Sequence, residues 1–313
     1  MQILMYHAVS STIDSPLFSG MHGVTVEDFE CQLSYLIKNG TALNERDVFT
    51  AAKTENYPKD DSFYLTFDDG FKQHFNNVFP VLKDYGIQAS FFVPTMPIES
   101  YIVPIVEKQR LLQYNLFSTY QEFLEVFCGL ARKVSRIKDK SVLYPNNDNI
   151  NNSKDYLQEY NFYSSQERLF RLIRNEYLSV KDFTSIVNNM FSKFYCSDKK
   201  FIDEYFMSAS DLKTMNDNNM VIGGHSYSHP FLNKIASSEM KIEIDRSMSF
   251  LRKTIDKGVN SFAYPFGVFN DDIVEYLYQE NIDYAFDTRS KGSNHRYNLK
   301  RIDATSFFNK TKV

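Results

Sequence analysis

The most constraining feature of this chain is a pair of adjacent carboxylates directly after an apolar run. Phe63-Tyr64-Leu65 leads into Thr66-Phe67-Asp68-Asp69-Gly70. A short apolar run bounded by turn residues predicts a buried strand, here Phe63 to Phe67. Unpaired charge at the end of a buried strand is strongly disfavoured, so a partner has to offset it. We expect that partner to be a metal ion.

A second motif supplies further metal ligands. In Gly224-His225-Ser226-Tyr227-Ser228-His229-Pro230, two imidazoles lie four residues apart. One Asp with two His is a three-ligand set that leaves a position for water, as in catalytic zinc sites. This mixture suits Zn²⁺, with Co²⁺ or Ni²⁺ as substitutes. A lone His is more often a core or surface residue. Two at this spacing, after the flexible pair Gly223-Gly224, favour a metal site.

The motifs TFDDG and HSxxH, in this order, resemble those of the polysaccharide deacetylase family, also called the NodB-homology family or carbohydrate esterase family four. The resemblance covers roughly Met1 to Met96 and Met207 to the C-terminus, about two thirds of the chain. It implies a distorted (β/α)7 barrel and a metal-dependent hydrolase that removes an N-acetyl group from an amino sugar. It also implies Asp69, His225 and His229 as metal ligands and Asp68 as the catalytic base.

The expected general acid stands in an unusual place. The family usually carries it in a Leu-x-His motif near the C-terminus, but Leu299-Lys300-Arg301 has no His there, and His295 lies in a polar loop. His7 instead follows the first predicted strand. This resembles the circularly permuted branch, similar to poly-N-acetylglucosamine deacetylases, and implies that His7 protonates the leaving amine. The alternatives are a buried His7 without a catalytic role, and His295 as the acid.

A third motif departs from the family pattern. Ala263-Tyr264-Pro265-Phe266-Gly267 stands where the family has Arg-x-Pro-Tyr-Gly, so Ala263 replaces the arginine that would brace the base. The resemblance implies that the backbone N–H of Phe266 helps to stabilise the oxyanion, with Tyr264 beside it at the substrate. Four residues near the later strands are open as replacements for the missing arginine: Asp283, Asp287, Arg301 and Asp303.

Strands and helices alternate along the chain, which predicts an α/β fold with a parallel sheet. Strands are expected at 2–9, 63–67, 88–93, 220–222, 261–264, 282–286 and 299–307. Helices are expected at about 26–39, with Thr25 as its cap and Gly40 as its end, and at 77–85, 210–216, 238–255 and 270–278. The motif residues follow predicted strands, so they can converge at the carboxyl ends of those strands.

The segment 97–206 differs from the rest. We expect it to be a helical insertion within a single deacetylase domain that spans 1–313. Helical patterns cover 117–134, 166–177 and 182–194, while the Asn-rich tract 146–152 predicts an exposed loop. The insertion is either a packing or dimerisation element or a lid that shapes substrate access.

Composition narrows the class of protein. A hydrophobic fraction of 43% supports a sizeable core, and a net charge of −4 argues against a nucleic-acid partner. Cys31, Cys128 and Cys196 lie far apart, which predicts free thiols in a reducing compartment. Neither a signal peptide nor a transmembrane segment is recognisable, so we expect a cytoplasmic protein.

The expected function is thus N-deacetylation of an amino sugar in a surface-glycan or polysaccharide pathway, with a divalent metal as cofactor. The same residues could serve an N-deformylase or an amidase on a related sugar or a non-sugar amide. From another class, a catalytically silent glycan-binding domain also fits. Asp68 speaks against that alternative, because a pure binder needs no second acidic group beside the ligand. The sequence leaves the oligomeric state open.

Overall fold

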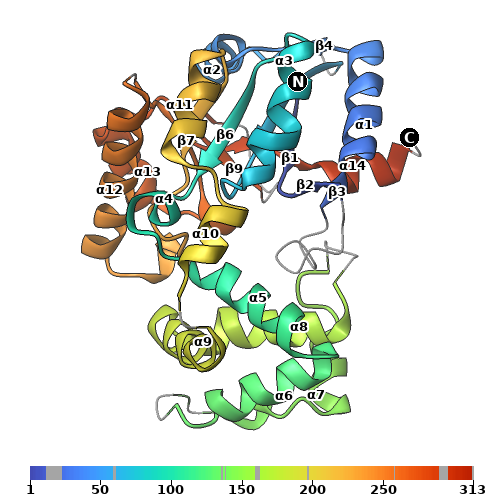
Figure 1. The fold of residues 1–313 in the computed structure, drawn as a ribbon, viewed down its shortest axis with the longest axis vertical. Helices are drawn as coiled ribbons and strands as arrows, with labels where there is room; N and C mark the ends of the chain where they lie inside the picture. Colours follow the sequence, from blue (N-terminus) through green and yellow to red (C-terminus); the bar gives the residue numbers. More distant parts are fainter. Residues whose placement is uncertain are drawn as a thin grey trace. The chain divides into compact units, whose positions relative to one another are not determined.

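The computed structural model describes residues 1–11, 23–58, 61–134, 137, 139–158, 163–195, 197–256, 258–288 and 295–311 (Figure 1). The chain divides into two compact units. One comprises Met1–Pro104 and Asp198–Val313, and the other comprises Ile105–Ser197. The second unit lies inside the expected insertion 97–206.

The first unit is built on a parallel sheet. Its strands are β1 (Gln2–Tyr6), β4 (Thr41–Ala42), β5 (Ser62–Phe67), β6 (Ala89–Val93), β7 (Val221–Gly224), β8 (Ser261–Ala263), β9 (Tyr284–Asp287), β10 (Leu299–Lys300) and β11 (Ile302–Asp303). Their order is β10-β9-β8-β7-β6-β5-β1-β11, with β4 paired to β5. A separate parallel pair joins β2 (Val9–Ser10) and β3 (Val24–Thr25).

The two ends of this sheet meet at Arg301. β10 pairs with β9, where Leu299 lies opposite Phe286, and β11 pairs with β1, where Ile302 lies opposite Leu4. A single residue, Arg301, separates β10 from β11. The described strands therefore form a nearly closed parallel barrel. Along the main path of the sheet it has seven strands if β10 and β11 are counted as one interrupted strand. This confirms the predicted α/β barrel fold.

Helices surround the strands of this barrel, and the helix Glu45–Thr54 packs against inward-facing residues such as Ile3 and Tyr64. The helices are α1 (Val26–Asn39), α2 (Glu45–Thr54), α3 (Phe79–Asp84), α4 (Met96–Ser100), α10 (Lys199–Tyr205), α11 (Ala209–Asp217), α12 (Ser237–Ile255), α13 (Asp271–Gln279) and α14 (Ala304–Thr311), with a π-helical turn at His74–Val78 before α3. The predicted caps are confirmed: Thr25 accepts the N–H of Asp28, Gly40 ends α1, and Asn270 accepts the N–H of Ile273.

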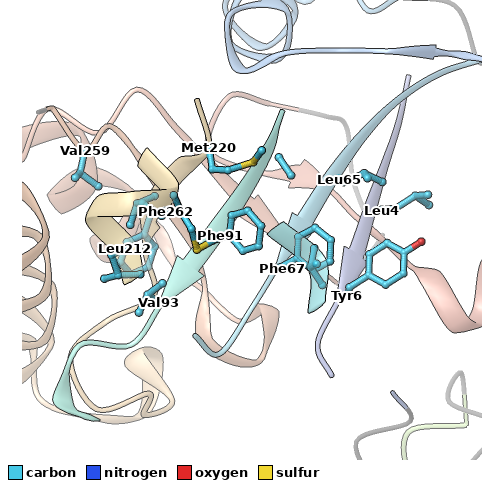
Figure 2. Close-up of a cluster of buried hydrophobic side chains, with 14 of the residues drawn as sticks. Leu4, Tyr6, Leu65, Phe67, Phe91, Val93, Leu212, Met220, Val259 and Phe262 are labelled. Atoms are coloured by element: carbon cyan, nitrogen blue, oxygen red, sulfur yellow. The ribbon is translucent and has the colours of Figure 1, made fainter. Parts of the chain in front are cut away.

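Side chains alternate between the two faces of the strands, as the pleat requires. On β1 and β5, Leu4, Tyr6, Leu65 and Phe67 belong to the large cluster that packs outward against the helices (Figure 2). A smaller cluster on the other face includes Ile3, Tyr64, Phe92, Phe286 and Leu299. Even-numbered residues of β5 thus point to the inside of the barrel, which sets the direction of Asp68 just beyond its end.

The predicted strand 299–307 is wrong in its second half. Extended structure ends at Asp303, and α14 begins at Ala304. The Asp303 carboxylate accepts hydrogen bonds from Thr305 Oγ1 and from the N–H of Ser306. A carboxylate in this capping position favours a helix start over a continued strand, although the apolar residues Phe307 and Phe308 fit either pattern.

The second unit is helical. It contains α5 (Ile105–Leu116), α6 (Tyr120–Ala131), α7 (Asn147–Asn152), α8 (Ser165–Leu172), a π-helical turn at Ile173–Tyr177 and α9 (Val180–Phe194). Its core is aromatic: the Phe170 ring lies 5.3 Å from Phe123 and 5.0 Å from Phe127. The expected loop at 146–152 is wrong, because Asn146 accepts the N–H of Asn149 and caps the short helix α7.

Two of the three cysteines can be placed. Cys31 is exposed and Cys128 is buried, and both are free thiols, as predicted. Cys196 lies outside the described residues. Among the helices that the structure describes, none combines the length and apolar character needed to cross a membrane.

Candidate active site

The adjacent carboxylates lie where β5 leaves the barrel. Both are buried, and the N–H of Asp68 continues the ladder by donating to the carbonyl of Tyr6. Asp69 has φ of 73° and Gly70 has φ of 67°, so the chain turns sharply directly after Asp68. This turn lets consecutive side chains face the same region, which an extended strand would not allow. A Cβ atom at Gly70 would stand 2.9 Å from Val93 Cγ1.

The two predicted histidines meet Asp69. His229 Nε2 lies 3.4 Å from Asp69 Oδ1, His225 Nε2 lies 3.6 Å from it, and the two Nε2 atoms are 3.2 Å apart. His225 Nδ1 donates to the carbonyl of Ala263 at 2.7 Å, which leaves its Nε2 as a lone-pair donor. The structure therefore gathers the three residues as a group able to hold a metal ion.

The spacing of these atoms fits a small tetrahedral metal. With metal–ligand distances of about 2.0–2.1 Å, neighbouring ligand atoms of a tetrahedral zinc lie about 3.3 Å apart. The three separations here, from 3.2 to 3.6 Å, bracket that value. Lone pairs held this close repel one another without a cation or proton between them. The residues present thus fit the implied metal, although its binding remains a prediction.

Strained backbone gathers at the same place. Asp69, Ser226, His229 and Phe266 all have φ between 59° and 73°, a left-handed conformation that non-glycine residues rarely adopt. Each such residue costs on the order of 1–3 kcal/mol and persists only where the surrounding structure enforces it. Four of them around one group of polar side chains is typical of a functional site.

The base candidate Asp68 has an arginine partner. Arg301 Nη1 and Nη2 donate to the two carboxylate oxygens of Asp68 at 2.7 and 2.6 Å, and Nη1 also lies 3.3 Å from Thr66 Oγ1. Both side chains of this pair are buried. Burial alone would raise the pKa of Asp68, but Arg301 and the neighbouring histidines hold it below its usual value. Asp68 is thus ionised at neutral pH.

This pairing favours Arg301 among the four candidates for replacing the missing motif arginine. Of the four candidates, Arg301 contacts Asp68, whereas Asp303 caps α14. Asp287 accepts the N–H of Arg301 with its backbone carbonyl, and Asp283 donates its own N–H to the carbonyl of Asn260. The arginine that pairs with the candidate base therefore lies between β10 and β11, where the barrel closes.

His7 lies beside the carboxylates. It follows β1, whose last residue Tyr6 pairs with Phe67 directly before Asp68. Its charge acts on the pKa values of both Asp68 and Asp69, which places it in their electrostatic neighbourhood. The competing acid, His295, is exposed and accepts the N–H of Tyr297 with its Nδ1. The geometry therefore supports His7 as the acid, and its role remains a prediction.

The sequence reasoning missed His74. This residue is buried at the start of the π-helical turn, and its Nε2 donates to the carbonyl of His7 at 2.5 Å. Within the described part of the chain, its Nδ1 has no hydrogen-bond partner. Burial lowers the pKa of His74 to about 4, so the imidazole is neutral. Its hydrogen bond fixes the backbone from which His7 projects. The sequence offered one indication that His74 lies near the site, namely its position four residues after Gly70, the end of the TFDDG motif.

The two candidate residues of the third motif, Tyr264 and Phe266, lie in different environments. Tyr264 is fully buried, donates its hydroxyl to the carbonyl of Tyr297, and uses its N–H in a hydrogen bond to Phe286, so its side chain lies in the core and away from the carboxylates. Phe266 lies at the site: its ring is 4.6 Å from that of His229 and stacks on Phe231 at 3.9 Å. An oxyanion role for the backbone N–H of Phe266 remains a prediction.

The fold and the site together define an α/β barrel with buried Asp and His residues gathered at the carboxyl ends of its parallel strands. The polysaccharide deacetylase family model matches residues 55–123 and 188–285, more than half of the chain. The chain belongs to the polysaccharide deacetylase family, which confirms the resemblance found in the sequence.

Individual relatives agree with this assignment. YxkH of Bacillus subtilis, provisionally described as a polysaccharide deacetylase, is 30% identical over 92 residues, 29% of this chain and 30% of the relative. The deacetylase PplD of Streptococcus pyogenes superposes with a TM-score of 0.56 at 16% identity, covering 99% of this chain and 96% of PplD. IcaB from Ammonifex degensii gives 0.55 at 15%, covering 96% and 90%. At these identities the two structures support the fold alone.

Proposed function

We propose that this protein is a metal-dependent hydrolase that removes an N-acetyl group from an amino sugar in a surface-glycan or polysaccharide pathway. The observation that carries the proposal is the convergence of Asp69, His225 and His229 beside an ionised Asp68 that is paired with Arg301. Family membership supports deacetylation as the reaction class. We keep the predicted cytoplasmic location as part of this proposal.

Asp69, His225 and His229 would hold the metal, with Zn²⁺ as the ion that suits one carboxylate and two imidazoles. Such an ion polarises a carbonyl and lowers the pKa of bound water towards about 7. The chain's own residues supply the proton transfers. Asp68 accepts a proton from the attacking water, whose oxygen bonds to the carbonyl carbon, and His7 delivers a proton to the nitrogen as the C–N bond breaks. The products are acetate and the free amine.

The neighbours of Asp68 and His7 prepare these two roles. The bidentate Arg301 pair fixes the orientation of Asp68 and keeps it charged, so it is ready to accept a proton. The hydrogen bond from His74 fixes the backbone of His7. The backbone N–H of Phe266 would donate to the developing oxyanion. A glycan-binding domain without turnover would need neither the braced carboxylate nor an acid beside it.

The test is product release by the metal-loaded protein on a panel of N-acetylated mono- and oligosaccharides, with N-formylated analogues and simple amides beside them. Release of acetate and a free amine from the sugars, abolished in Asp68→Asn, is expected. Release of formate with no acetate would replace the proposal by an N-deformylase. Saturable glycan binding with no product from any substrate would replace it by a silent binding domain.

A further inference from the structure

The loop between the two histidine ligands needs support from outside. Ser226 and His229 have φ of 61° and 59°, so the backbone of this loop adopts a conformation that side chains disfavour. The loop sets the separation of His225 and His229, whose Nε2 atoms are 3.2 Å apart. The contacts that hold its backbone therefore also determine the geometry of the candidate metal site.

Some of that support is local or comes from the neighbouring strand end. The N–H of His229 donates to Ser226 Oγ at 3.0 Å, within the loop. The carbonyls of Ser226 and Tyr227 accept the N–H groups of Thr95 and Met96, at 3.3 and 2.9 Å. These bonds satisfy carbonyl groups of the loop and leave the N–H groups at its tip to another acceptor.

That acceptor is Glu243, in the middle of α12. Its Oε2 accepts the N–H of Ser228 at 2.7 Å, and its Oε1 accepts the hydroxyl of Ser228 at 2.6 Å. One side chain thus accepts both the backbone and the side-chain donor of Ser228, directly before the second candidate ligand. Hydrogen bonds to a charged acceptor are among the stronger ones in proteins.

A second residue of the same helix face fixes the loop from the side. Arg246, three residues after Glu243, lies 3.8 Å from the ring centre of Tyr227. It also donates to Glu99 Oε2 and to Ser100 Oγ, each at 3.0 Å. The hydroxyl of Tyr227 donates to the same Ser100 Oγ. Arg246 therefore holds the side chain of Tyr227, whereas Glu243 holds the backbone.

We propose that Glu243 is a positioning residue for the metal site: it maintains the strained loop so that His225 and His229 present their Nε2 atoms at ligand spacing. This inference rests on the proposed function, because it assumes that these histidines bind a metal. Residues that orient metal ligands from outside typically change metal affinity about 10- to 100-fold when mutated. We expect an effect of that size here.

The test is the zinc affinity of full-length Glu243→Gln, measured by competition with a chromophoric chelator. Glutamine keeps the shape of the side chain but presents an NH₂ group to one of the donors. Glu275→Gln, the same change at an exposed position of α13, is the matched control. We expect the dissociation constant of Glu243→Gln to rise about 10- to 100-fold, with the control within twofold of the unmodified protein. The visible spectrum of the Co²⁺ form should change for Glu243→Gln alone.

Ser228→Ala makes the test independent of whether Glu243→Gln folds. It removes one donor and keeps the backbone bond, so the zinc affinity should fall in the same direction by a smaller factor. Unchanged zinc affinity and an unchanged Co²⁺ spectrum in either folded variant would overturn the inference. If the unmodified protein itself bound neither metal, the proposed function would fail, and this inference with it. The two failures are therefore distinguishable.

Discussion

Replacing Arg301 by methionine should disrupt the site and destabilise the fold together. In the folded protein the guanidinium makes two charge-assisted hydrogen bonds to Asp68, and both side chains are buried. Methionine retains much of the apolar contact with Phe92 and Phe286, whose ring centres lie 5.6 and 5.7 Å from the guanidinium. The dominant change is thus an unpaired carboxylate in the barrel.

The expected cost follows from that unpaired charge. Breaking a buried ion pair by removing one partner typically costs about 3–5 kcal/mol. Asp68 has a lowered pKa in the folded state, so its pairing contributes stability above the unfolded pKa of about 3.9 and loses it as pH falls through the folded value. Without Arg301, burial raises the pKa of Asp68. The deficit of Arg301→Met should therefore be largest at neutral pH and shrink towards acid.

Urea denaturation of the metal-free protein at several pH values between 4 and 8 measures this. The double variant Asp68→Asn, Arg301→Met is the control, because removing both charges should restore part of the lost stability. In the activity assay, the acidic limb of the pH–rate profile should move to higher pH in Arg301→Met. A variant within 1 kcal/mol of the unmodified protein at pH 7, with an unmoved acidic limb, would refute the reasoning.

Further variants and one pH series test the remaining residues. The double variant His225→Ala, His229→Ala should lose nearly all bound metal by elemental analysis, whereas full occupancy would exclude these ligands. Asp68→Asn should keep the metal and lose about 10²- to 10⁴-fold in turnover; a near-normal rate would make Asp68 structural. Burial lowers the pKa of His225, but the nearby carboxylates raise it above its usual value, so zinc affinity should begin to fall with decreasing pH already near neutrality. An affinity that is flat from pH 8 to 6 would contradict this. His7→Ala should slow turnover and remove the alkaline limb of the pH profile; a crippling His295→Ala beside a mild His7→Ala would make His295 the acid.

Local signals predicted most of the fold. The caps Thr25 and Asn270 and the stop at Gly40 depend on neighbours within a few residues, so the sequence carries them directly. The error at 299–307 arose because apolar residues such as Phe307 fit a strand or a helix equally well. At this position the carboxylate of Asp303 favours a helix start, because it accepts the N–H of Ser306. The apolar pattern alone does not contain this effect.

The partner of Asp68 could not be chosen from sequence for a different reason. Arg301 and Asp68 are 233 residues apart, and their contact depends on closure of the barrel. That closure sets the register of the last strand against β9 and β1, which periodicity does not specify. The candidate metal ligands were easier to group from sequence, because His225 and His229 share one short loop and Asp69 belongs to a strong local motif.

Closure of the barrel and bracing of the base depend on the same strands. β1 lies between β5 and β11, and Arg301, directly before β11, pairs with Asp68, directly after β5. His7 projects from the end of the same strand β1. The N-terminal strand thus supplies the candidate acid and also holds the seam at the distance from which arginine can pair with the base. We therefore expect an arginine at position 263 to be dispensable, because Arg301, between β10 and β11, already pairs with Asp68.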